Sequence, residues 1–191
     1  GKQGFALGQA ALDLGANVFL IVRPPPISTP VGAQRVNVST AAEMQKAVLD
    51  SIVDADVLIM TAAVADFRPA NPSEEKIKKA SGVPALTLQA TPDVLGAAAT
   101  YQSERGRPRL MVGFAAESQN LLENARAKLS AKKLDLIVAN DVTHPQAGFG
   151  VDTNRVTLLW TDGREEALPL MSKLDVAEKI MEAVVKLWEE K

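Results

Sequence analysis

The chain has 191 residues, of which 47 % are hydrophobic and 23 % are charged, a composition typical of one globular domain with a sizeable buried core. Its 21 basic and 23 acidic side chains give a formal charge of -2, which argues against a nucleic-acid partner. Cysteine is absent, which excludes disulfides, thiolate metal sites and cysteine nucleophiles, and suits a reducing compartment. No apolar run approaches the roughly 18 residues that a membrane span needs, so we expect no membrane partner.

Helices and strands alternate along the chain. An apolar helical pattern at 5–14 leads into a buried strand at 17–22, which is typical of a βαβ unit whose first strand and connecting loop are missing. Helices are then expected after Thr40, from 91, over 118–132, and after Ser172, with Thr40 and Ser172 as capping residues. Strands are expected at 35–38, 56–60, 85–90, 110–114 and 134–139, and a hairpin from 155–160 to 166–170 around the turn 161–163.

This order predicts a single α/β domain over 1–191. The sheet is expected to be doubly wound, mostly parallel and Rossmann-like, with a β-hairpin near its C-terminal edge. In such a sheet, ligands bind beyond the carboxyl ends of the strands. The segments that follow the strands are therefore the first places to look for a site.

Three such segments carry candidate binding residues. The strand at 56–60 ends in small residues that let a ligand approach the backbone, and Asp66 is the first charge to follow. Residues 91–95 open a helix whose free N–H groups suit an anion or a polar base. Phe114 has the right chemistry to stack on an aromatic base. Each segment also has a purely structural alternative. These are a close strand-to-loop connection after 60, an ordinary helix cap at 91–95, and a phenylalanine of the core at 114.

The lysines suggest an anionic ligand. Lys76, Lys78 and Lys79 lie in the aperiodic stretch 66–84, where they are either solvated or part of a lid that closes over a polyanion. Lys128 and Lys132 share one helix face about 6 Å apart, where they are either an ordinary surface pair or are neutralised by an anion or an acidic partner. The sole histidine, His144, is interpreted as incidental, and the spacing of His, Asp and Glu predicts no protein metal site.

Seven segments of the chain occur together, in the same order, in a known family. They are 1–6 (GKQGFA), 61–69 (TAAVADFRP), 75–79 (EKIKK), 91–95 (TPDVL), 112–117 (VGFAAE), 133–141 (KLDLIVAND) and 148–154 (GFGVDTN). Together they resemble the phosphopantothenate–cysteine ligase (phosphopantothenoylcysteine synthetase) domain of the bacterial coenzyme A biosynthesis bifunctional protein. The resemblance covers essentially the whole chain.

The resemblance implies a ligase that joins 4′-phosphopantothenate to cysteine. In that family the carboxylate is first activated by CTP as an acyl-cytidylate with release of pyrophosphate, and the cysteine amine then displaces CMP. The resemblance further implies Mg²⁺, which bridges phosphate oxygens with few protein ligands. It also implies a cytoplasmic homodimer, and fusion to or association with a flavin-dependent decarboxylase domain. We expect no flavin in this chain.

The resemblance assigns residues to this chemistry. Lys76 is implied as the catalytic lysine, which neutralises charge on the nucleotide phosphates. The implied nucleotide-binding residues are Thr61, Ala62, Ala63, Asp66, Lys76, Pro92, Asp93, Val94, Leu95, Phe114, Lys128 and Lys132. Asn140 and Asp141 lie in a matching segment without an assigned role. Of the family's Asn-x-Ser-Ser-Gly-Lys segment only Gly1-Lys2 is present, so we expect the chain as given to fail at ligation.

Two other functions remain open from the sequence. One is an NAD(P)-dependent oxidoreductase of Rossmann type, although no Gly-x-Gly-x-x-Gly is visible and Tyr101 is followed four positions later by Arg105 in place of lysine. The other is a non-enzymatic nucleotide-binding module, which would bind CTP without releasing pyrophosphate.

Overall fold

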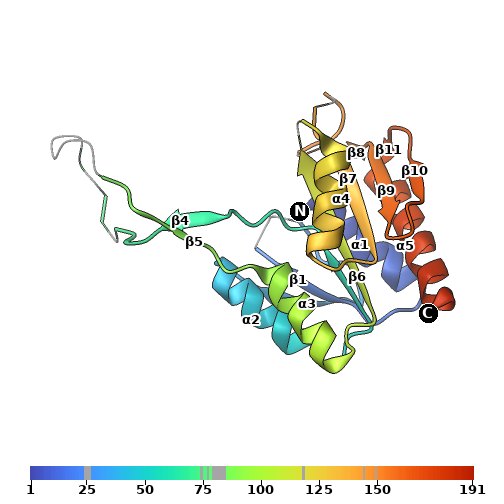
Figure 1. Ribbon diagram of the computed structural model, residues 1–191, viewed down its shortest axis with the longest axis horizontal. Helices are drawn as coiled ribbons and strands as arrows, with labels where there is room; N and C mark the ends of the chain where they lie inside the picture. The colour runs from blue at the N-terminus through green and yellow to red at the C-terminus, as the bar shows by residue number, and fades with distance from the viewer. Residues whose placement is uncertain are drawn as a thin grey trace.

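The computed structural model describes residues 1–23, 27–73, 75–76, 78, 85–117, 119–143, 145–148 and 150–191. Within these residues the main sheet has five strands in the order β10-β9-β7-β6-β3 (Figure 1). Their bounds are β3 (Val57–Met60), β6 (Leu110–Glu117), β7 (Leu136–Asp141), β9 (Val156–Trp160) and β10 (Glu165–Ala167). β3, β6 and β7 run parallel, whereas β9 and β10 form the antiparallel hairpin that the sequence predicts at this edge.

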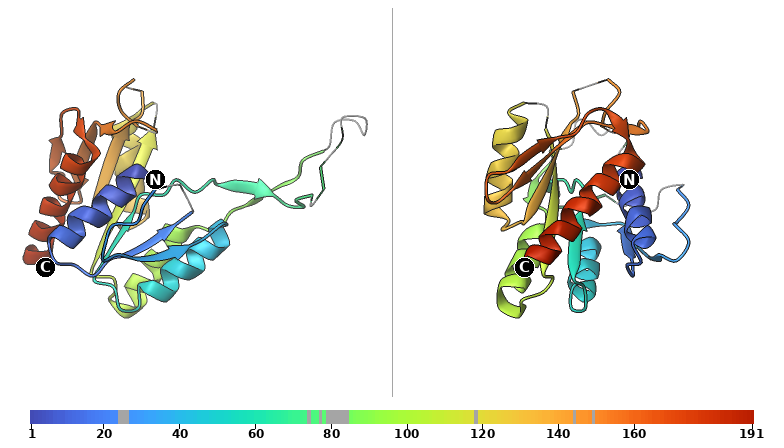
Figure 2. Two further views of the ribbon diagram at one scale, coloured as in Figure 1. Left: turned by 180° about the vertical axis from the view of Figure 1, so that it is seen from behind. Right: turned by 90° about the vertical axis from the view of Figure 1, so that its right-hand side faces the viewer.

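Helices cover both faces of this sheet (Figure 2). α1 (Lys2–Asp13) and α5 (Lys173–Glu190) pack on one face, and α2 (Ala41–Ser51), α3 (Val94–Arg105) and α4 (Leu121–Ala131) cover the other. Because side chains alternate along a strand, β6 sends Leu110 and Val112 toward α1 and α5, and Met111 and Ala115 toward the other three helices. The doubly wound, mostly parallel α/β fold is thereby confirmed.

The predicted helix caps form as expected. The Thr40 hydroxyl accepts a hydrogen bond from the Glu43 N–H at 3.1 Å, and the Glu43 carboxylate accepts one from the Ser39 N–H at 2.8 Å. The Ser172 hydroxyl accepts a hydrogen bond from the Asp175 N–H at 3.1 Å. Short polar side chains at these positions therefore fix where α2 and α5 begin.

Three pairs of strands lie outside the main sheet. β1 (Phe19–Val22) pairs in parallel with β2 (Gln34–Asn37), and β8 (Thr153–Asn154) pairs antiparallel with β11 (Met171–Ser172). In the described part of the chain, β1 bonds only to β2, and β3 bonds only to β6, so each keeps one open edge. Each open edge leaves backbone N–H and C=O groups available to a further strand.

The third pair forms an arm that extends away from the body of the domain (Figure 1). β4 (Phe67–Pro69) and β5 (Leu88–Ala90) pair antiparallel, and every residue of both strands is exposed. The sequence predicts the second strand but places it at 85–90, and it misses the first, because a three-residue strand within a polar stretch has no period to detect. None of the helices that the structure describes has the length and apolar character to cross a membrane.

Candidate functional site

The carboxyl ends of β3 and β6 meet the start of α1. The parallel register pairs Met60 with Gly113, so the following residues, Thr61 and Phe114, come next to each other at this edge. Gly4 in the first turn of α1 lies so close that a Cβ there would be 2.9 Å from the Thr61 Oγ1. The approach of helix to strand therefore requires glycine at this position, and it brings the N-terminus of α1 to the edge where ligands bind in this fold class.

Lys128 of α4 and Lys132, its C-cap residue, connect the start of α3 to β6. The Lys132 ammonium pairs with the carboxylate of Asp93, the N-cap residue of α3. The Lys128 ammonium donates a hydrogen bond to the Phe114 carbonyl at 2.8 Å. Four of the predicted nucleotide-binding residues are thus brought together, although Asp93 and Lys132 are separated by 39 positions in the sequence.

The surroundings of Asp93 favour its charged form. Partial burial acts to raise the pKa of this carboxyl, but hydrogen bonds from the Lys132 ammonium and the Gly96 N–H, with the charges of Lys132 and Lys128, lower it overall. Asp93 is therefore the acidic partner of the two lysines, which is one of the alternatives that their spacing leaves open. The like-charge repulsion on α4 is relieved by a residue of the neighbouring helix.

The other predicted residues follow the strand ends. Ala62, Ala63 and Asp66 are exposed on the connection from β3 to β4, and Pro92 is half-buried before α3. Val94 and Leu95, in contrast, are buried and pack in the core on the α2–α4 face, so they can offer a ligand their backbone N–H groups but not their side chains.

A cavity of about 350 Å³ opens beside this edge. It lies between the start of α2, the connection from β3 to β4 and the start of α3, and Pro92 is the one predicted residue that lines it. Its basic lining residues are Arg23 and Arg68, and the buried Oγ1 of Thr91, also in its lining, has no hydrogen-bond partner within the described residues. Sequence reasoning did not find this cavity, because its walls come from segments that are distant in sequence.

Lys76 lies apart from these residues. It is exposed and follows β4 in the chain, and the β4–β5 pair extends away from the body of the domain (Figure 1). Among the described residues, no hydrogen bond or ion pair joins Lys76 to the strand ends. Lys79 and His144 lie outside the described residues.

Three polar residues near the same edge are buried, which the sequence does not predict. Asn140, Asn154 and Lys173 are 8 %, 1 % and 7 % exposed, respectively. The Asn140 Oδ1 has no hydrogen-bond partner within the described part of the chain. Both asparagines fall in segments that match the family, which is a signal for them. Lys173 falls in none, and nothing in its spacing indicates burial.

The fold and this edge define a doubly wound α/β domain with a cationic site at the carboxyl ends of parallel strands. The chain belongs to the family described as the DNA/pantothenate metabolism flavoprotein C-terminal domain, whose profile matches residues 1–187. This finding confirms the resemblance and does not favour an oxidoreductase.

Similar proteins agree with the family. The coenzyme A biosynthesis bifunctional protein CoaBC of Bacillus subtilis (strain 168) is 46 % identical over 188 residues, which are 98 % of this chain and 45 % of that protein. The chain thus spans about half the length of the curated relatives that it matches. A crystal structure of the C-terminal domain of CoaBC superposes with a TM-score of 0.81 at 34 % identity, covering 100 % of this chain and 84 % of that one. A Cab2 mutant in complex with phosphopantothenate-cysteine shares the fold at 14 % identity, with a TM-score of 0.68 over 98 % of this chain and 77 % of that one.

Asp93 gives a test of the tie between α3 and α4. Asp93→Ala removes the helix cap and the ion pair, so we expect its free energy of unfolding at pH 7 to fall by about 1 kcal/mol. Asp93→Asn keeps an oxygen for the Gly96 N–H and should lose less. Urea denaturation of wild type and both variants measures the difference.

The pH dependence of this effect has a defined sign. Because the pKa of Asp93 is lowered in the folded state, its charge stabilises the fold above the ordinary aspartate pKa of about 3.9, and this is lost as the pH falls through the lower folded pKa. Wild type and Asp93→Asn should therefore converge in stability at acidic pH. A difference between them that persists at pH 2 would contradict the charge-based explanation.

Proposed function

We propose that this chain forms the phosphopantothenate–cysteine ligase site of a coenzyme A biosynthesis protein. Family membership supports the proposal, and the observation that carries it is the convergence of Phe114, Asp93, Lys128 and Lys132 at the carboxyl edge of the sheet. A nucleotide needs cations for its phosphates, and Lys128 and Lys132 lie at this edge. Phe114 joins them through its backbone carbonyl, while its half-buried side chain packs against the core on the α1–α5 face.

The proposed reaction has two steps. A carboxylate oxygen of 4′-phosphopantothenate attacks the α-phosphorus of CTP, and the bond from that phosphorus to the pyrophosphate oxygen breaks. The product is an acyl-cytidylate with a good leaving group. The cysteine amine then attacks the acyl carbon, its proton is lost, and the bond to the CMP oxygen breaks to leave the amide.

The described residues divide this work by position. The Phe114 ring would stack on the cytosine, and the start of α3, from Pro92 to Leu95, would contribute backbone N–H groups. The ligand would also contact the connection from β3 to β4, at Thr61, Ala62, Ala63 and Asp66. Lys128 and Lys132 would bind the phosphates. Lys132 can exchange its contact with the Asp93 carboxylate for a phosphate oxygen, so the ion pair keeps the ammonium in place before the nucleotide arrives.

Mg²⁺ fits this arrangement as an ion carried by the nucleotide. Among the residues that the structure describes, no three or more His, Cys, Asp or Glu side chains gather into a metal site. Mg²⁺ commonly binds through substrate phosphates with only one or two carboxylates, and Asp66, exposed immediately before β4, would offer such a carboxylate. Bound there, the ion would neutralise phosphate charge.

The arm supports two further parts of the proposal. The arm points away from the body of the domain (Figure 2). Lys76 would therefore reach a triphosphate only if the arm folds over the carboxyl edge of the sheet, either in its own domain or in a second copy. Phe67, Leu86 and Leu88 are 63 %, 67 % and 53 % exposed on the arm, a concentration of apolar surface that favours cover by another chain. We therefore propose a homodimer whose arms contribute Lys76 to the site.

The wider setting follows from the relatives. Their greater length supports fusion to, or association with, a flavin-dependent decarboxylase domain. Location in the cytoplasm stays a prediction.

Lys76→Gln tests the catalytic assignment. In a chain that carries the upstream asparagine segment, we expect this variant to abolish acyl-cytidylate formation without unfolding the domain. A charged hydrogen bond to phosphate is worth about 1.5–3 kcal/mol, and more in a closed site. Pyrophosphate release measures the effect, and Lys78→Gln, two positions along the arm, is the matched control. Wild-type release by the Lys76 variant would refute the assignment.

The two α4 lysines can be tested by binding. We expect the Lys128→Ala, Lys132→Ala double variant to bind CTP at least about tenfold more weakly, since each lysine is proposed to form a charge-assisted contact to phosphate. Calorimetric titration gives the affinity. A double variant at Lys179 and Lys186 of α5 removes the same net charge elsewhere and should bind normally. Equal weakening in both double variants would indicate a general charge effect and no phosphate site on α4.

A further inference from the structure

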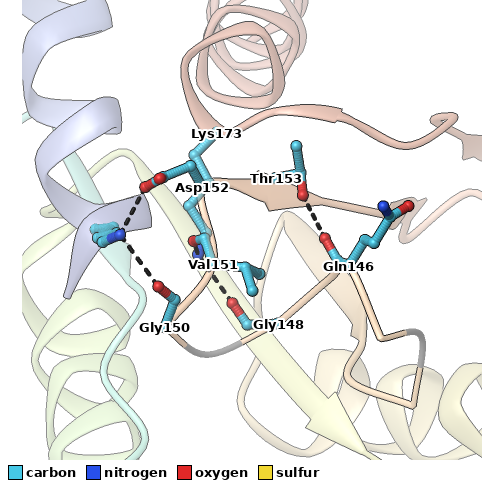
Figure 3. A network of polar contacts seen from close by, with 8 residues as sticks. Gln146, Gly148, Gly150, Val151, Asp152, Thr153 and Lys173 are labelled. Atoms are coloured by element: carbon cyan, nitrogen blue, oxygen red, sulfur yellow. Dashed lines mark hydrogen bonds and ion pairs between the residues drawn. The ribbon is translucent and has the colours of Figure 1, made fainter.

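A buried lysine holds the loop between β7 and β8 (Figure 3). The Lys173 side chain belongs to the first residue of α5 and is 7 % exposed. Its ammonium donates hydrogen bonds to the carbonyls of Gly148, at 2.8 Å, and Val151. The Lys173 backbone N–H donates to the Asp152 carbonyl at 2.9 Å, so one residue contacts the described part of loop 146–152 at three points.

Two neighbours complete the attachment of this loop. Asn154, 1 % exposed, accepts a hydrogen bond from the Gly148 N–H at 2.9 Å. Lys2 of α1 pairs with the Asp152 carboxylate at 2.6 Å and donates to the Gly150 carbonyl at 3.1 Å (Figure 3). The loop is thereby fixed between α1 and α5.

The position of Lys173 is electrostatically unfavourable. Its charge is buried, it lies at the N-terminal end of a helix, where a cation opposes the helix dipole, and Lys2 is close by. Burial, followed by the charge of Lys2, lowers the pKa of this ammonium, while Asp152 acts weakly in the other direction. An apolar side chain would avoid these costs, but it could not bind two carbonyl groups at once. Holding the loop is thus the contribution that requires an ammonium.

The same cluster reaches the proposed site through α1. The Gln3 side-chain amide donates to the Lys173 carbonyl at 3.0 Å, and its oxygen accepts from the Asn154 amide at 3.1 Å. The next residue, Gly4, lies close to Thr61, the residue after β3, since a Cβ at Gly4 would be 2.9 Å from the Thr61 Oγ1. A continuous set of contacts therefore runs from Lys173 through Gln3 to the helix start at the carboxyl edge.

We propose that Lys173 is a positioning residue for nucleotide binding: it fixes loop 146–152 and, through Gln3, sets the first turn of α1 against Thr61. The proposal rests on the proposed function for its ligand, CTP, but the clamp itself is a property of the fold. Lys173 touches no reacting atom in this scheme. It acts by keeping the backbone N–H groups at the start of α1 aligned with the strand ends, where a misplacement of about 1 Å can cost up to about a hundredfold.

The test uses Lys173→Met in the full natural chain. We expect CTP to bind about tenfold more weakly, as measured by calorimetry, because the helix start is no longer held in register. The Gly148 amide should exchange with solvent faster, because the Gly148 and Val151 carbonyls lose their donor and the loop is no longer held. Lys179→Met on the same helix, which loses only an exposed pair with Glu182, is the matched control.

Gln3→Met is an independent test that leaves the Lys173 ammonium in place. It should weaken CTP binding in the same direction, and the double variant should be less than additive, because both changes break one chain of contacts. Wild-type CTP affinity in Lys173→Met, or in Gln3→Met should the first variant not fold, overturns the proposal. If wild type itself binds no CTP, the proposed function fails, and Gly148 exchange in Lys173→Met still decides whether the clamp exists.

Discussion

The parallel pairing of β6 with β3 and β7 is the constraint on which the rest of the structure depends. Leu110, Met111 and Val112 are fully buried because helices cover both faces of this strand. Parallel strands all end at the same edge of the sheet. The connection that follows each of them therefore leaves from that carboxyl edge. Thr61, just after β3, and Asn140, near the end of β7, come to this edge for that reason, and Phe114 of β6 lies beside Thr61. The site is thus a consequence of topology, and its chemistry comes from the residues that topology brings to the edge.

The lysines at this edge are held either by carboxylates or by backbone carbonyls. Asp93 accepts the Lys132 ammonium, and Asp152 accepts that of Lys2, but the Lys173 and Lys128 ammonium groups are held by backbone carbonyls. Carbonyl groups satisfy the hydrogen-bonding needs of an ammonium without cancelling its charge. These contacts therefore fix the positions of the ammonium groups at this edge before any ligand binds.

Much of this could be predicted from sequence because it depends on local patterns. Thr40 and Ser172 cap helices through residues three positions away, and apolar periodicity located the buried strands. What could not be predicted depends on approach between distant elements. The Asp93–Lys132 pair requires the start of α3 to meet the end of α4. Lys173 looks like any polar residue of an amphipathic helix until α1 and the β7–β8 loop cover it. The arm was missed because β4 has neither length nor period.

The central claim is that this edge activates a carboxylate as an acyl-cytidylate. Its most direct test omits cysteine from a mixture of CTP, Mg²⁺, 4′-phosphopantothenate and the chain extended upstream through the asparagine, and detects products by mass spectrometry. The account predicts a species with the mass of the phosphopantothenoyl-cytidylate, which is consumed with release of CMP once cysteine is added. Amide formation without any nucleotide adduct, or no reaction at all in a folded protein that binds CTP, would contradict it.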